Sequence, residues 1–196
     1  NAPNFYSNSD IEELLEKKAV WIKRKLDENK KTFQREELKF QNNEILFFFG
    51  AKIKLKVEKG FDNKVLLDNQ LLMVQYKRKN TNIKLLIEDW YRTELNSFIK
   101  KRVDYWAEKM SVNYKYIFLQ TYNKRLGSCS INGHINFNWK IVMLPYSIID
   151  YIIIHELAHI IHFDHSKNFW LLVEKYNPSY KKNKKWLQKN FSVLNW

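Results

Sequence analysis

The residues with the clearest chemical signature are two histidines and a glutamate in the stretch His155-Glu156-Leu157-Ala158-His159. This is an H-E-x-x-H pattern. Residues four apart on a helix lie on one face, so the imidazoles of His155 and His159 would converge on one metal ion. Glu156 lies one step further around the helix, where its carboxylate would reach water on the metal rather than the metal itself. The pattern predicts a hydrolytic centre with one catalytic Zn²⁺ ion.

A catalytic zinc needs a third protein ligand as well as an open position for water. His162 lies on the same predicted helix face, but it is about 10 Å from His155 along a straight helix. His165 fits better, because it follows the helix and the neighbouring Asp164 tolerates the left-handed backbone that a reversing chain can require. Glu174 is a rival carboxylate ligand. We therefore expect His165 to complete the set, with Glu174 and His162 as the alternatives.

Further polar residues are weaker candidates. Arg125 is a candidate contact for a substrate carboxylate, a phosphate or an oxyanion, although a structural charge that fixes a hairpin is the favoured interpretation. Tyr180 is a candidate oxyanion donor. Cys129 is not favoured as a nucleophile, because a thiol between apolar strand residues is usually inert. The lysines of residues 181–189 indicate either a nucleic-acid surface or, as we favour, a solvated helix face.

The elements that must position these residues can be read from hydrophobic periodicity and turn signals. The pattern predicts an amphipathic helix over residues 9–29, an antiparallel meander of strands between 45 and 76, and a long helix over 82–110 with Asn80 or Thr81 as its N-cap. Strands at 116–121, 128–131 and 135–139 follow, with Asn132-Gly133 as a hairpin turn.

The H-E-x-x-H residues fall in a predicted helix over 148–161, for which Ser147 and Asp150 form a capping box. Ser166 would cap a helix over 167–176, and Pro178 would open the last helix. The expected fold class is α+β: a twisted, mainly antiparallel sheet packed on the long helix and the active-site helix. We expect residues 1–80 to form an N-terminal helix and meander, either continuous with the rest of the fold or as a small lobe, and residues 81–196 to form the zincin-like metallohydrolase core.

Length and composition limit the other possibilities. The chain has 196 residues, 45% of them hydrophobic and 28% charged, which excludes disordered and low-complexity classes. The net charge of +13 attracts phosphates or nucleic acid in one interpretation and reflects a Lys-rich composition in the favoured one. A single cysteine, no signal peptide and no membrane-spanning stretch predict a cytoplasmic protein without a membrane partner. The oligomeric state is not predicted.

A series of motifs resembles the YgjP-type predicted metal-dependent hydrolases, which are related to the WLM and SprT-like metallopeptidases. The motifs occur in this order: Arg125-Leu126-Gly127-Ser128-Cys129-Ser130, Ile135-Asn136-Phe137-Asn138-Trp139, Pro145, Ile149-Asp150-Tyr151, His155-Glu156-Leu157-Ala158-His159, His165-Ser166 and Phe169-Trp170. The resemblance implies a zincin-like fold with a gluzincin-like core. It also implies zinc held by His155, His159 and His165, with Glu156 as the catalytic carboxylate. Leu126 departs from the family, which usually has Trp there.

The leading functional hypothesis is zinc-dependent hydrolysis of peptide bonds, with a peptide or protein substrate aligned by the strand at 135–139. One alternative is a zinc-dependent nucleotide pyrophosphatase, because the same activated water attacks a phosphoanhydride and the positive charge favours such substrates. A second alternative is a DNA-associated, SprT-like protease or binding module, suggested by the basic residues 181–189.

Overall fold

The computed structural model describes residues 8–31 and 38–196. It divides the chain into two units, residues 1–36 and residues 37–196. The first unit contains the helix α1 (Asn8–Lys31), which confirms the helix predicted over residues 9–29. All the candidate site residues belong to the second unit. The assignment of residues 81–196 as the metallohydrolase core stays a prediction.

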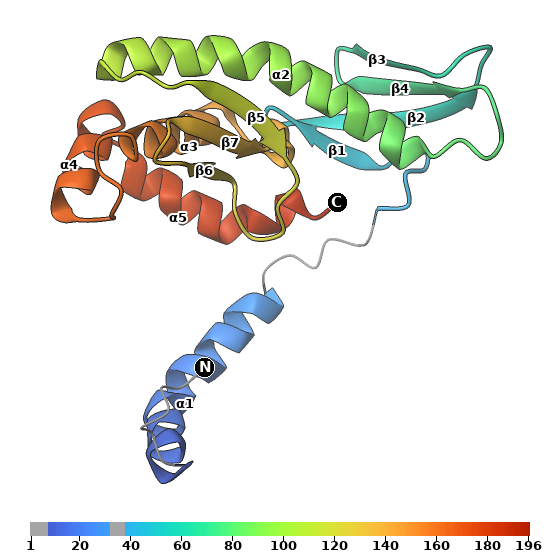
Figure 1. The fold of residues 1–196 in the computed structure, drawn as a ribbon. Coiled ribbons are helices and arrows are strands. Elements are labelled where there is room, and N and C mark those ends of the chain that lie inside the picture. The colour runs from blue at the N-terminus through green and yellow to red at the C-terminus, as the bar shows by residue number, and fades with distance from the viewer. Residues whose placement is uncertain (1–7, 32–37) are drawn as a thin grey trace. The chain divides into compact units, whose positions relative to one another are not determined.

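The second unit has an α+β fold with two small sheets, as the sequence predicts in outline (Figure 1). Its elements are, in order, β1 (Ile45–Phe48), β2 (Ala51–Lys59), β3 (Lys64–Asp68), β4 (Leu71–Tyr76), α2 (Ile83–Met110), β5 (Tyr116–Gln120), β6 (Gly127–Cys129), β7 (His134–Asn138), the 3-10 helix η1 (Trp139–Met143), α3 (Tyr146–Ala158), α4 (Lys167–Tyr176), α5 (Tyr180–Asn190) and the 3-10 helix η2 (Phe191–Leu194).

The first sheet has the strand order β1-β2-β4-β3. The predicted antiparallel meander is wrong, because β2 pairs with β4 in parallel, from Lys54 opposite Leu71 to Lys59 opposite Tyr76. The β3 strand turns back along the outer side of β4 and does not separate it from β2. Alternation of apolar and polar residues in β2 predicts one buried face, and Ile53 is indeed buried, but alternation carries no information about strand direction.

The second sheet has the order β5-β7-β6. The β6 and β7 strands form the antiparallel hairpin that the Asn132-Gly133 pair predicts, and Gly133 adopts a φ of +75° in its turn. The β5 strand pairs with β7 in parallel, so this sheet too is not purely antiparallel. Because β7 lies between two partners, the expectation that residues 135–139 align a substrate peptide is wrong. The edge of this sheet that contacts α3 is β6.

The long helix α2 runs along both sheets (Figure 1). Its N-cap is Asn82, whose side-chain oxygen accepts a hydrogen bond from the Leu85 amide at 3.2 Å, rather than the predicted Asn80 or Thr81. One face of the helix is buried and contributes to the hydrophobic core. Its buried residues recur at helical spacing: Ile87, Tyr91, Leu95, Ile99, Val103, Ala107 and Met110.

The helix α3 is tied to α2 by a charged contact. Asp150 accepts hydrogen bonds from Arg102 Nε and Nη2, each at 2.5 Å, and from Trp106 Nε1 at 2.9 Å. The predicted capping box is therefore wrong: α3 has Pro145 as its N-cap, and no side chain bonds the first turn. The carboxylate of Asp150 points to another helix instead of back to its own.

We expect Arg102→Ala to lower the free energy of unfolding by about 1–3 kcal/mol, because it leaves the largely buried carboxylate of Asp150 without its charged donors. Lys100→Ala is the matched control on the same helix, since Lys100 pairs with Asp104 at an exposed position and its loss costs less than about 0.5 kcal/mol. Urea denaturation of both variants measures the difference. Equal losses would contradict a structural role for the Arg102 contact.

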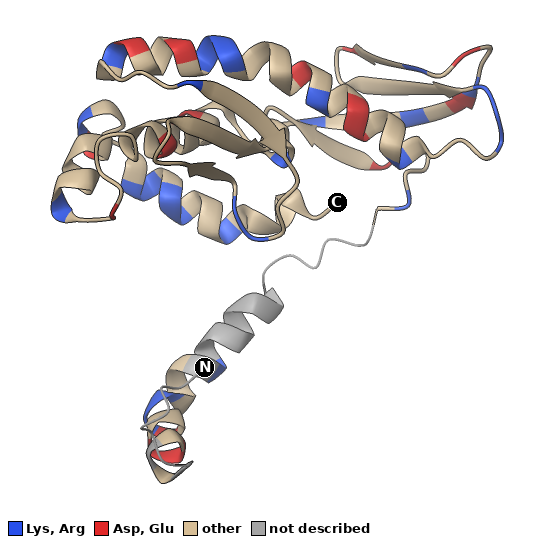
Figure 2. Ribbon diagram, in the orientation of Figure 1, with Lys and Arg blue, Asp and Glu red and all other residues tan. Residues whose placement is uncertain are grey.

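The helices α4 and α5 follow α3 in the sequence. Ser166 is the N-cap of α4, as predicted, and its hydroxyl accepts from the Phe169 amide. The helix α5 begins at Tyr180 with Ser179 as its N-cap, so the prediction that Pro178 opens it is wrong by two residues. Lysine residues lie along α5 (Figure 2). No helix in the described ranges, 8–31 and 38–196, is long and apolar enough to cross a membrane.

Candidate metal centre

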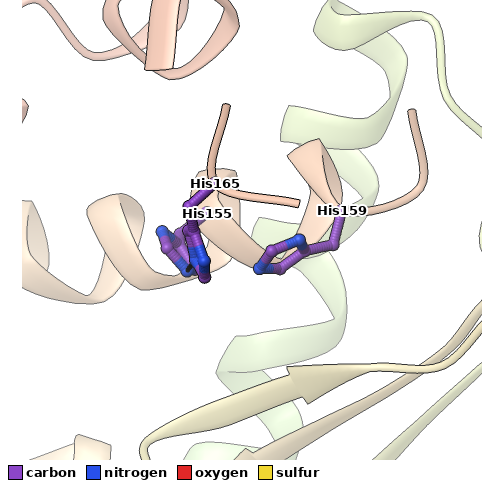
Figure 3. A group of neighbouring side chains, drawn as sticks. All are labelled: His155, His159 and His165. Atoms are coloured by element: carbon purple, nitrogen blue, oxygen red, sulfur yellow. Dashed lines mark hydrogen bonds between the residues drawn. The ribbon is translucent and has the colours of Figure 1, made fainter. Parts of the chain in front are cut away.

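Three histidines that are separated in sequence meet at the end of α3 (Figure 3). His155 lies in the last turn of the helix, His159 is its C-cap, and His165 lies in the turn that leads to α4. The Nε2 atoms of His155 and His165 are 3.2 Å apart. One ligand nitrogen from each of the three histidines lies within 4.8 Å of the others. These residues are the ones for which the sequence predicts a shared metal ion.

The path of the chain after α3 explains how His165 arrives there. The helix ends at Ala158, three residues before the predicted end, and the His162 and Ile161 amides both donate to the Ala158 carbonyl. The chain then reverses, and the Asp164 carboxylate accepts from the Ser166 amide at 3.3 Å. Asp164 is not among the described residues with positive φ, so it shapes the turn through this hydrogen bond and not through a left-handed backbone.

The orientation of His159 is set by the same turn. Its Nδ1 lies 3.1 Å from the His162 carbonyl oxygen, so Nδ1–H donates there and Nε2 is left to face the other imidazoles. His162 thus contributes its backbone to the site and is not in the group of three. Burial lowers the pKa of His155 to about 3 and also lowers the pKa of His159. Both imidazoles are therefore neutral at pH 7, which is the form that binds a metal.

Two aromatic side chains of α4 support the imidazoles. The ring of the buried Phe169 has its centroid 4.6–4.9 Å from the centroids of His155, His159 and His165. The Trp170 ring lies 5.8 Å from His155 and 5.6 Å from His165. This apolar packing restricts the rotation of the imidazoles, so the three nitrogens are held together before any ion binds.

Glu156 lies next to the histidines and is 6% exposed. Burial raises the pKa of its carboxyl group to about 8, and the positive charge of Arg125 opposes that rise. The strand β6 lies close to this carboxylate at Gly127, where an added Cβ atom would be 2.6 Å from Glu156 Oε1. The absence of a side chain at Gly127 is what allows the carboxylate to lie against the sheet edge.

A cleft of about 280 Å³ opens beside Glu156 and His155. Its lining comes from three parts of the fold: the segment before β6, the middle of α3, and the end of α5 with η2. The remaining lining residues are Lys124, Leu126, Gly127, Tyr151, Ile152, Leu187 and Phe191. Most of these side chains are apolar, so the cleft offers a hydrophobic groove that leads to a carboxylate and a histidine.

The comparison with protein families agrees with this geometry. The model of the YgjP-like metallopeptidase domain matches residues 1–190, nearly the whole chain. The chain belongs to the YgjP-like metallopeptidase family. The resemblance found in the sequence motifs is thereby confirmed, and membership implies a metal ion, which the three neighbouring imidazoles are able to bind.

Two solved structures resemble part of this YgjP-like chain. They are the crystal structures of the metallopeptidase zymogens abylysin from Pyrococcus abyssi and jannalysin from Methanocaldococcus jannaschii. Their identities are 22% and 23%, and their TM-scores are 0.43 and 0.42. Each covers 46% of this chain, and 93% and 95% of the respective zymogen chains are covered. No curated protein matches the chain.

The remaining candidates of the YgjP-like chain lie outside the group of three. Glu174 pairs with Lys181 at 3.5 Å on the surface and does not join the histidines. Tyr180 is buried and stacks on Trp170, so one side chain separates it from His165. Its role as an oxyanion donor stays a prediction without a contact to support it.

Arg125 precedes β6, and Cys129 is the last residue of that strand. The Arg125 carbonyl accepts from Asn138 Nδ2 at 3.1 Å, which fixes the turn, while its exposed guanidinium acts electrostatically on Glu156. Burial and the charge of Glu156 raise the pKa of Cys129 to about 11. A thiol with that pKa is protonated at neutral pH and is not a nucleophile.

Sequence reasoning gave no role to the residues that pack around the imidazoles and the carboxylate. Phe169 lies four residues after His165 and contacts its ring, and Trp170 stacks on Tyr180. The positions of these two aromatic residues in the sequence do not indicate a metal site. Gly127 belongs to the stretch Arg125–Ser130, one of the motifs that carry the family resemblance. Its contact with Glu156 joins residues 29 positions apart and has no local signature.

We expect Gly127→Ala to displace the Glu156 carboxylate and to lower hydrolytic activity at least tenfold, because a Cβ at 2.6 Å from Oε1 forces the side chain to move. Ser128→Ala is the matched control on the same strand, since it removes only a 3.5 Å contact with Asn136. Activity is measured together with the melting temperature. Full activity in Gly127→Ala would contradict the inferred packing.

Proposed function

We propose that this chain is a zinc-dependent peptidase in which His155, His159 and His165 hold the ion and Glu156 is the general base. The observation that carries the proposal is the convergence of three imidazoles beside one buried carboxylate. Membership of the YgjP-like metallopeptidase family supports a peptide or protein substrate. A zincin-like core for the α3 region and a cytoplasmic location belong to the same proposal.

The donor set fits zinc. Zinc–nitrogen bonds of 2.0–2.1 Å in tetrahedral geometry separate two ligand nitrogens by about 3.3 Å. The distance of 3.2 Å between the Nε2 atoms of His155 and His165 agrees with that separation. Three protein nitrogens leave one tetrahedral position open, as a catalytic site requires. Bound zinc supplies Lewis acidity, which acidifies water and polarises the scissile carbonyl group.

Glu156 supplies the proton transfer in this scheme. Its buried carboxylate accepts the proton of the attacking water and then donates it to the nitrogen of the leaving amine. Burial raises the pKa of this carboxyl group to about 8, and a cation held by the three histidines would favour the ionised form that accepts the proton. The position of Glu156 beside His155, at the end of the cleft, brings the base to the peptide bond that the cleft accommodates.

The edge strand β6 is suited to align the peptide. Its inner side pairs with β7, and the sheet order leaves its outer side without a strand partner in the described part of the chain. An extended peptide that pairs with this edge would pass the carboxylate of Glu156, against which Gly127 packs. The apolar side chains of Leu126, Ile152 and Leu187 would then contact its side chains.

The proposal is tested by depleting the protein of metal, restoring Zn²⁺, and assaying an unfolded protein such as casein beside a panel of nucleoside triphosphates. We expect proteolysis that disappears with the metal and returns with zinc, and no release of phosphate. Zinc-dependent release of phosphate without proteolysis would replace the proposal by the pyrophosphatase alternative. DNA binding that weakens steeply with salt would instead support the DNA-associated alternative.

A further inference from the structure

Basic side chains lie on both sides of the cleft. Lys124 lines it directly, and Arg125 is the next residue. On the other side, α5 contributes Lys184, whose Nζ lies 4.4 Å from the centroid of the Trp170 ring. Lys184 is three residues before the lining residue Leu187, so both lie on one face of α5. Figure 2 shows the basic residues of α5 and of the segment before β6.

These cations have no carboxylate partner in the part of the chain that the structure describes. The ion pairs found there do not include Lys124, Arg125 or Lys184. Lys181, one turn before Lys184, is by contrast paired with Glu174. Glu156 is the sole acidic residue in the lining of the cleft. Lys124 and Glu156 are the charged residues in that lining, and Arg125 and Lys184 add positive charge from the adjoining segments.

The cations near the reactive residues come from two different parts of the fold, the segment before β6 and the helix α5. Arg125 lies two residues before Gly127, against which the carboxylate of Glu156 packs. The Nζ atom of Lys184 lies over the ring of Trp170, which packs against His155 and His165. Both cations are exposed, and their neighbours are the aromatic rings of Tyr122 and Trp170 rather than carboxylates. A carboxylate placed between the segment before β6 and the helix α5 would interact with cations from both.

We propose that the cleft selects peptides that carry a carboxylate close to the scissile bond, with Lys124, Arg125 and Lys184 as the residues that recognise it. The carboxylate belongs either to an acidic side chain or to a free C-terminus. This inference rests on the proposed function for the identity of the site. It goes beyond that function, because it names the class of peptide that binds and the side chains that make the choice.

Binding assays test the selectivity for a carboxylate, and cleavage assays separately test the proposed peptidase function. Zinc-loaded Glu156→Gln protein is titrated with fluorescent peptides in matched pairs, and fluorescence anisotropy reports their affinities. One pair differs by Glu against Gln and has amidated termini; a second is neutral and differs by a free against an amidated C-terminus. We expect one pair to show tighter binding of the charged member, by about two- to fivefold for each cation engaged. The difference should shrink at high salt.

The substitution Lys184→Glu should weaken that preference, whereas Lys185→Glu, the same charge change at the adjacent exposed position, should keep it unchanged. Equal affinities within both pairs, or equal losses in the two variants, would overturn the inference. Cleavage of the same peptides by the wild-type protein tests the proposed function by itself. A charge preference in binding without any cleavage would contradict the peptidase and leave the selectivity supported.

Discussion

Replacement of Glu156 by Gln is expected to lower kcat for peptide hydrolysis by about 10²–10⁴-fold while zinc stays bound. The amide has nearly the shape of the carboxylate, so it fits the same space beside Gly127. It cannot accept the proton of the attacking water, and proton transfer to the leaving amine is lost with it. Because Glu156 is not among the three clustered ligands, the metal content should equal that of the wild type.

Glu174→Gln is the matched control for this change. Glu174 is an exposed acid of α4 that pairs with Lys181, and it lies outside the cleft lining. We expect wild-type activity and wild-type zinc content in this control. Initial rates on an unfolded protein substrate and zinc content by mass spectrometry measure both quantities. A Glu156→Gln protein that keeps zinc and also keeps full activity would show that another group is the base.

The second large effect is expected at His165. His165→Ala removes one of three nitrogens that lie within 4.8 Å of one another, so zinc affinity and activity should both fall sharply. His162→Ala should retain zinc, because His162 contributes its carbonyl oxygen to His159 and that group survives the substitution. Glu174→Ala should retain zinc as well. The measurement is the zinc stoichiometry of the three variants after parallel dialysis.

The opposite pattern has a definite meaning. If His165→Ala retains zinc as well as the wild type and Glu174→Ala loses it, the ligand set consists of two histidines and one glutamate. The turn after α3 would then serve only to orient His159. Circular dichroism of each variant separates loss of metal from loss of fold, since α3 and its buried face do not depend on the side chain of His165.

The parts of the fold that the sequence predicts well are those that depend on local spacing. The helix α2 is confirmed to within one residue at its start, and the hairpin at Asn132-Gly133 forms where the turn chemistry places it. His155 and His159 are one turn apart, so their proximity follows from the helix itself. For His165, sequence reasoning supplies the need for a reversing chain, and the structure has one between Ala158 and Ser166.

The features that sequence reasoning missed depend on contacts between distant residues. Asp150 has the position of a capping residue, yet its partner is Arg102, 48 residues earlier in the chain. The parallel pairing of β2 with β4 likewise joins two strands between which β3 lies in the sequence, and the alternation within either strand does not encode it. The close approach of Gly127 to Glu156 and the placement of Phe169 among the imidazoles also require the assembled fold.

The most direct test of the metal centre is a crystal structure of the zinc-loaded protein, with anomalous diffraction recorded at the zinc absorption edge. We predict one strong peak about 2.0–2.1 Å from the Nε2 atoms of His155, His159 and His165, with a free position facing Glu156. A peak coordinated by Glu174 or by Glu156 in place of His165, or a fully loaded protein whose zinc lies away from these histidines, would contradict it.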